Sequence, residues 1–170
     1  MDKWNGILTI IDIQHWDYDG NLLWEQKNIK NMLHQEGEEF LLMAAFTGGP
    51  NSTVIPENYY LRLDNRQVIA VPDILDNLIG EPTSGGYERQ AVSSSGDFSL
   101  NFESNHYIAN SPIVVFRSTV GNWGPVTNLF LATTNDNTGF LISSVVLNTP
   151  LTMATGNNIT MRIGLRIGGC

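Results

Sequence analysis

The chain has 170 residues, a length that suits one domain able to bury about two-thirds of its unfolded surface. Its formal net charge is −8, and its 9 basic residues are spread along the chain, which argues against binding to nucleic acid. No apolar run approaches the roughly 20 residues that cross a bilayer, and the first residues contain no secretory signal, so we expect a soluble protein made in the cytoplasm, without membrane contact.

The first part of the chain predicts a β-hairpin followed by one helix. Residues 6–14 are apolar and β-branched, and an Asp-Gly turn signal separates them from a second strand at 22–26. Apolar residues at helical spacing then predict a helix over about residues 31–47. Gly37 interrupts this pattern at a cost of about 1 kcal/mol, so we expect another part of the chain to pack closely there.

From residue 58 onward, the pattern predicts strands and loops. A helical turn capped by Asp73 is expected at 73–78. The expected strands are 59–63, 87–92, 113–116, 129–132, 140–147 and 159–167. The whole chain, 1–170, is therefore expected to form a single mostly β domain, a β-sandwich or jelly-roll-like body with an N-terminal β-hairpin and one packed α-helix.

Each candidate metal or catalytic site in the sequence is better explained by a structural role. The three histidines do not share a metal-binding spacing, and Asp17, Asp19 and Asn21 differ from a calcium loop in where the glycine stands. The loop carboxylates and Ser93–Ser95 lack the surrounding motifs of glycosidases and serine hydrolases. We therefore expect no catalytic residue, cofactor site or metal site, and hence no enzyme.

The chain ends supply the candidate interface residues. Most of the four tryptophans are expected in the core, but Trp4 lies in a terminal segment with little local structure to bury it. Residues 1–6 are therefore a candidate docking arm, and 166–170 a candidate flexible tail. The single cysteine, Cys170, excludes an intramolecular disulfide and a cysteine-based metal site. Trp4, Arg166 and Cys170 are the candidate contacts with other proteins.

Seven short sequence blocks occur in a definite order over about residues 7–165. They are Asp19–Glu25, Asn28–Asn31, Glu36–Leu42, Tyr59–Leu63, Gly80–Pro82, Gly86–Val92 and Trp123–Val126. In order and spacing they resemble small virion proteins of tailed bacteriophages. Where similar sequences tend to have a Thr-type cap before the helix, this chain has His34.

The resemblance implies a particle component without enzymatic activity or cofactor. We expect a cement or decoration protein on the capsid exterior, bound to the major capsid protein of the shell and assembled as a homo-oligomer, with a trimer favoured. A head-to-tail connector, tail or fibre component stays open as an alternative. The aromatic residues alone would also suit a carbohydrate-binding module.

Overall fold

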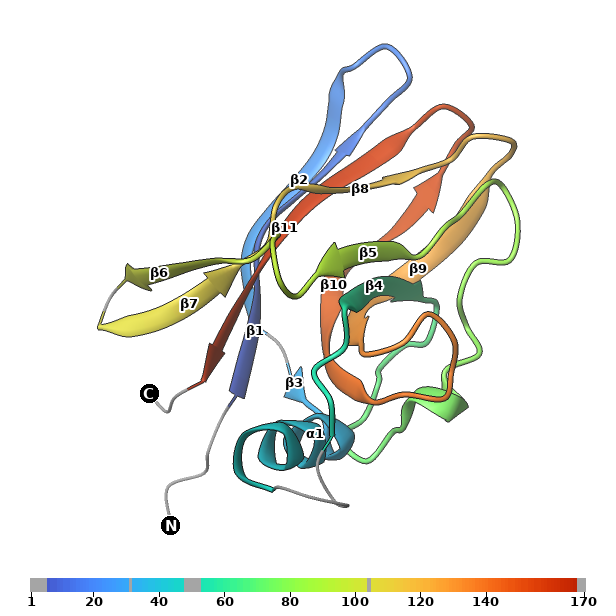
Figure 1. The fold of residues 1–170 in the computed structure, drawn as a ribbon. Helices are drawn as coiled ribbons and strands as arrows, with labels where there is room; N and C mark the ends of the chain where they lie inside the picture. Colours follow the sequence, from blue (N-terminus) through green and yellow to red (C-terminus); the bar gives the residue numbers. More distant parts are fainter. Residues whose placement is uncertain (1–5, 31, 48–52, 104, 168–170) are drawn as a thin grey trace.

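A computed structural model describes residues 6–30, 32–47, 53–103 and 105–167. Within these ranges it contains two antiparallel sheets and one α-helix (Figure 1). The mostly β, sandwich-like body with an N-terminal hairpin and one packed helix is therefore confirmed. No helix among the described residues is long and apolar enough to cross a membrane.

The first sheet has six strands, and its spatial order is β2-β1-β11-β7-β6, with β8 also paired to β11. Their bounds are β1 Gly6–Trp16, β2 Leu22–Lys30, β6 Ser99–Glu103, β7 His106–Asn110, β8 Val114–Arg117 and β11 Asn158–Ile167. One edge of β11 lies along β1, and its other edge pairs first with β8 and then with β7. The last described strand, β11, therefore lies beside the first, β1, in the interior of an open sheet.

The second sheet has five strands in the order β3-β10-β9-β4-β5. Their bounds are β3 Met32–Leu33, β4 Asn58–Asp64, β5 Gln90–Ser93, β9 Trp123–Ala132 and β10 Leu141–Met153. Strand β5 begins at Gln90, later than the predicted 87, because Tyr87 and Arg89 belong to a polar cluster in the preceding loop.

The main core lies between the two sheets and includes Ile159, Met161 and Ile163, the inward-facing residues of β11. This confirms the alternation predicted for the last strand. A second, smaller core contains Phe130 with Leu75. The apolar run at 129–132 is therefore buried on both faces, as a continuous apolar strand requires.

The helix, α1, spans Gln35–Phe46, so the predicted start at residue 31 is wrong. Residues 32 and 33 form β3 instead, because their backbones pair with Ser143 and Ser144 of β10. The expected close packing at Gly37 is confirmed, because a Cβ there would collide with the backbone carbonyl of Ile142.

A 3₁₀ turn at Leu75–Asn77 replaces the helical turn predicted over 73–78. The predicted cap by Asp73 is wrong, since Ile74 stands at the N-cap without a side-chain capping bond. The Asp73 carboxylate instead accepts a hydrogen bond from the backbone amide of Ala70 at 2.6 Å. Asp73 thus stabilises the preceding loop.

The strands extend close to both ends of the described chain. Gly6 pairs with Ile167, and Ile7 pairs with Arg166, so these residues belong to the sheet. The tail predicted at 166–170 therefore does not include Arg166 or Ile167. Residues 1–5 and 168–170 lie outside the described residues.

Candidate interaction surface

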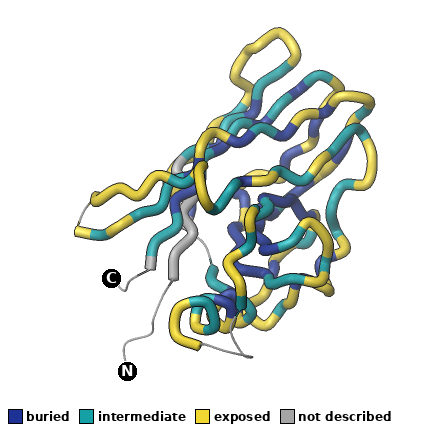
Figure 2. The backbone as a smooth tube through the Cα atoms, in the orientation of Figure 1, coloured by how far each residue is buried: buried dark blue, intermediate teal, exposed yellow. Residues whose placement is uncertain are grey.

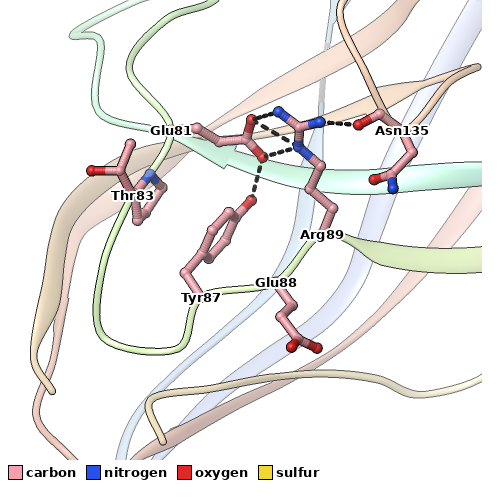
Figure 3. Close-up of a pocket in the computed structure, with 7 residues that line it drawn as sticks. Glu81, Thr83, Tyr87, Glu88, Arg89 and Asn135 are labelled. Atoms are coloured by element: carbon pink, nitrogen blue, oxygen red, sulfur yellow. Dashed lines mark hydrogen bonds and ion pairs between the residues drawn. The ribbon is translucent and has the colours of Figure 1, made fainter. Parts of the chain in front are cut away.

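A charged cluster links strand β4 to the loop between residues 80 and 89. The fully buried Arg62 of β4 donates from Nη2 to Oε2 of Glu81 at 2.6 Å. Arg89 Nη2 donates to the same carboxylate oxygen at 2.9 Å, and the Tyr87 hydroxyl donates to Oε1 at 2.8 Å (Figure 3). One carboxylate therefore bridges two cations and a phenol.

The remaining donors of this cluster also have protein partners. Arg62 donates to the Asp136 carbonyl at 3.0 Å and to the Asn137 side chain at 2.7 Å. Arg89 donates to the carbonyl of Asn135. The Tyr87 hydroxyl also accepts the backbone amide of Leu63 at 2.9 Å. The cluster therefore ties the loop near residue 136 to the rest of the second sheet.

The environment fixes the protonation of both acidic groups in the cluster. Burial acts to raise the pKa of Glu81, but the bonds with Arg62 and Arg89 outweigh it and hold that pKa below its ordinary value. Burial, together with the Glu81 charge, strongly raises the pKa of Tyr87. Near pH 7 the carboxylate stays ionised and the phenol stays protonated, so neither group is tuned for proton transfer.

An open depression of about 490 Å³ lies beside this cluster. Its lining residues are Glu81, Pro82, Thr83, Tyr87, Glu88, Arg89 and Asn135 (Figure 3). The charged atoms of Glu81 and Arg89 that border it are already bonded to each other. Because these charged atoms are engaged with each other, we interpret the cluster as a brace for the loops.

Two of the three histidines, His15 and His34, have polar packing roles. His15 Nε2 lies 3.2 Å from the Asn157 amide nitrogen, and His34 Nε2 lies 2.8 Å from the Ser144 hydroxyl. Burial lowers the pKa of both rings. His34 stands at the N-cap of α1 but its side chain makes no capping bond. Within the described ranges, no group of three or more His, Asp or Glu residues could hold a metal ion.

The segment from Asp17 to Asn21 is a hairpin turn, as predicted. Asp17 accepts hydrogen bonds from the backbone amide and the side chain of Asn21, at 2.7 and 2.9 Å. Gly20 has a φ of 82°, which suits its place in the turn. The two Asp17 oxygens that could have ligated calcium are thus engaged by the turn itself.

Of the three predicted interface residues, only Arg166 is described. It lies on β11, paired with Ile7, and is partly exposed. Trp4 and Cys170 lie outside the described residues. Among the other tryptophans, Trp123 is buried in the core, and Trp24 is partly buried against it.

The hairpin formed by β6 and β7 is amphipathic and exposed. Its register pairs Phe102 with Tyr107 and Leu100 with Ala109, so these four side chains lie on one face. The opposite face is mostly polar and carries Asn101. The side chains of Leu100, Phe102 and Tyr107 are 70%, 61% and 65% exposed, although the Phe102 and Tyr107 rings contact each other at 5.0 Å between centroids.

The base of this hairpin is firmly joined to the sandwich. Phe98, just before β6, packs edge-to-face on Tyr59 of the other sheet. The Ser111 amide, just after β7, donates to the Ile163 carbonyl at 2.9 Å, and the Ser111 hydroxyl accepts the Ile163 amide at 3.1 Å. The hairpin therefore leaves the body in a fixed direction.

The apolar face of the hairpin continues the core-facing side of the first sheet. Leu165 of β11 packs against the core and pairs with Ala109, which in turn pairs with Leu100. In Figures 1 and 2 the hairpin extends beyond the second sheet, and β6 is exposed along its length. Its apolar residues are exposed because the second sheet does not reach far enough to cover them.

The sequence contains a signal for this surface that the predictions missed. Residues 99–103 alternate polar and apolar side chains, a typical pattern for a half-buried strand. The segment lies among Ser and Asn residues and follows a turn at 93–97, which obscures the alternation, and the strands predicted from the sequence do not include it. The exposed aromatic residues that carry the surface are thus Phe102 and Tyr107, in the middle of the chain.

Comparison of the chain with protein-family models, with curated proteins and with solved structures finds no match. The function is therefore inferred from the residues and their geometry.

Proposed function

We propose that this chain is a non-enzymatic structural protein of a bacteriophage virion, and that it binds the capsid shell from outside as a cement or decoration protein. Its partner in this role is the major capsid protein. The observation that supports the proposal is the exposed apolar face of the β6–β7 hairpin, held by a rigid base. An exposed apolar face of this kind is typical of a protein–protein contact.

The net charge suits a protein that first accumulates as separate copies and then binds to the capsid. The net charge of −8 disfavours non-specific association while copies accumulate in the host cell. Each copy then makes modest contacts with the lattice and with its neighbours. Many such contacts acting together give strong attachment without a deep pocket.

The number of copies per particle tests the proposal. Virions that carry this chain are purified and quantified by gel densitometry against the major capsid protein. A cement protein follows the symmetry of the shell and is expected in hundreds of copies. About a dozen copies or fewer would place it in the neck, tail or fibres, and its absence from particles would contradict a virion role altogether.

A further inference from the structure

Strand β6 forms an open edge of the first sheet. Among the described strands it pairs with β7 alone. Glu103 pairs with His106, three positions further along the chain, and Asn105 has a φ of 65°. A closing pair with this separation is hydrogen-bonded, and hydrogen-bonded and non-hydrogen-bonded pairs alternate along the ladder, so the backbone groups of Leu100 and Phe102 point away from β7. These groups are available to another strand.

We propose that this edge pairs with β6 of a second copy of the chain, antiparallel about a two-fold axis at Asn101. In this register Leu100 lies opposite Phe102 of the second copy, and Phe102 opposite Leu100. The outward backbone groups of both residues then form the new ladder. A shift of one residue would place apolar side chains opposite polar ones, so the pattern selects against it.

The occupant is a second copy because the strand is complementary to itself. The two-fold register brings the apolar residues of both copies onto the same face of a continuous sheet. It also places Glu103 opposite Ser99 of the second copy, which keeps the two glutamates apart. Between residues 98 and 112 Glu103 is the one formally charged residue, so two copies can approach here without the repulsion that the acidic remainder of the surface produces.

In this register the Leu100 and Phe102 side chains of the two copies contact each other, since directly opposed residues of antiparallel strands lie about 4.5 to 5.5 Å apart. This contact is a two-fold one, in place of the trimer that the resemblance to phage virion proteins implies, and it does not depend on whether the protein binds a capsid shell.

Disulfide trapping tests the register directly. The variant carries Asn101→Cys in a Cys170→Ser background and is oxidised gently as a purified protein. At the two-fold axis the two Cα atoms at position 101 would lie about 4.5 Å apart, within the range of roughly 4.4 to 6.8 Å that disulfides span. We expect most of the protein to run as a covalent dimer on a non-reducing gel and to revert on reduction.

Ile108→Cys in the same background is the matched control. Ile108 lies opposite Asn101 on the same face of the hairpin, but in the dimer the two copies of position 108 would be about 14 Å apart, three strand spacings. This variant is expected to stay monomeric on the gel. Equal cross-linking at 101 and 108, or none at 101, would overturn the proposal.

Sedimentation measures the same contact without a cross-link. We expect the wild-type protein and Phe46→Ser to sediment as dimers, because Phe46 is exposed on α1, away from the hairpin. Phe102→Ser is expected to weaken the dimer at least tenfold. A monomeric wild-type protein, a trimer, or a dimer unaffected by Phe102→Ser would each overturn the pairing, while a low copy number in virions would count only against the cement role.

Discussion

The Glu81 cluster and the β6–β7 hairpin differ in whether their groups are already bonded or packed within the protein. In the cluster, four charged or phenolic side chains satisfy one another, and Arg62 is fully buried. In the hairpin, large apolar side chains stay exposed, and the backbone edge of β6 has no partner among the described strands. The charged groups of the cluster are thus engaged with one another, whereas the hairpin has an exposed apolar face and a free backbone edge.

The charges of the Glu81 cluster stabilise the protein's own structure. Glu81 makes ion pairs at 2.6 and 2.9 Å and has only a tenth of its side chain exposed. A buried ion pair adds little net stability over an apolar pair, but the loss of one partner is costly. Substitutions should therefore affect folding in the cluster and association in the hairpin.

The largest effect is expected for Glu81→Gln. The variant leaves the buried Arg62 guanidinium without its counter-charge, which should lower the free energy of unfolding by about 3 to 5 kcal/mol. Urea denaturation measures this change. Glu88→Gln, at an exposed residue of the same depression, is the control and should change the stability by less than about 0.5 kcal/mol. Similar effects of the two variants would contradict the role of the cluster as a brace.

A smaller effect is expected for Tyr87→Phe. It removes the hydroxyl that donates to Glu81 and accepts from the Leu63 amide, so the stability should fall by about 1 to 3 kcal/mol. Thermal unfolding followed by circular dichroism detects this loss. Tyr18→Phe, at a side chain that is 80% exposed, should leave the melting temperature unchanged. If both variants melted alike, the two hydrogen bonds would not matter to the fold.

The stability that Glu81 contributes should depend on pH. The folded state holds the pKa of Glu81 below its ordinary value of 4.5, so the unfolded state takes up a proton first as pH falls. The stability from this group is therefore complete above about pH 4.5 and is lost as pH falls through the folded-state pKa. The stability gap between wild type and Glu81→Gln should stay constant from pH 7 to 5 and narrow below that. A gap that widened in acid would contradict the assigned direction.

The smallest effect on folding is expected for Phe102→Ser. Because this side chain lies on an exposed face, its loss should change the free energy of unfolding of the monomer by no more than about 0.5 kcal/mol. Chemical denaturation at a protein concentration low enough to dissociate dimers measures it. A loss of several kcal/mol would show that Phe102 supports the core, and would weaken the case for an interaction surface.

Residues close in sequence allowed much of the fold to be predicted. The Asp-Gly turn predicts the β1–β2 hairpin, and the alternation after residue 158 predicts β11. The contacts that define the two compared regions join distant residues, such as Arg62 with Asn137 and Ala109 with Leu165. Such pairings have no local pattern, so the brace could not be predicted from periodicity. The alternation at 99–103 indicates a strand but does not show that its apolar face stays exposed.

Trp4 is a candidate contact residue because a terminal segment offers little to bury a large aromatic ring. Its role stays a prediction. The alternation around Phe102 is typical of a strand with one buried face, so it gives no sign that this face is exposed. Only the arrangement of the two sheets shows that this face extends beyond the second sheet, which would otherwise bury it.

The most direct test of the central claim is the number of copies of Phe102→Ser in purified virions, measured beside wild type and Phe46→Ser. If the protein is a shell component whose exposed hairpin joins neighbouring copies, wild type and Phe46→Ser should be present in hundreds of copies. Phe102→Ser should be reduced at least tenfold while remaining folded, because the loss of one repeated contact is multiplied over the lattice. Equal incorporation of all three proteins, or no wild-type protein in the particle, would contradict the account.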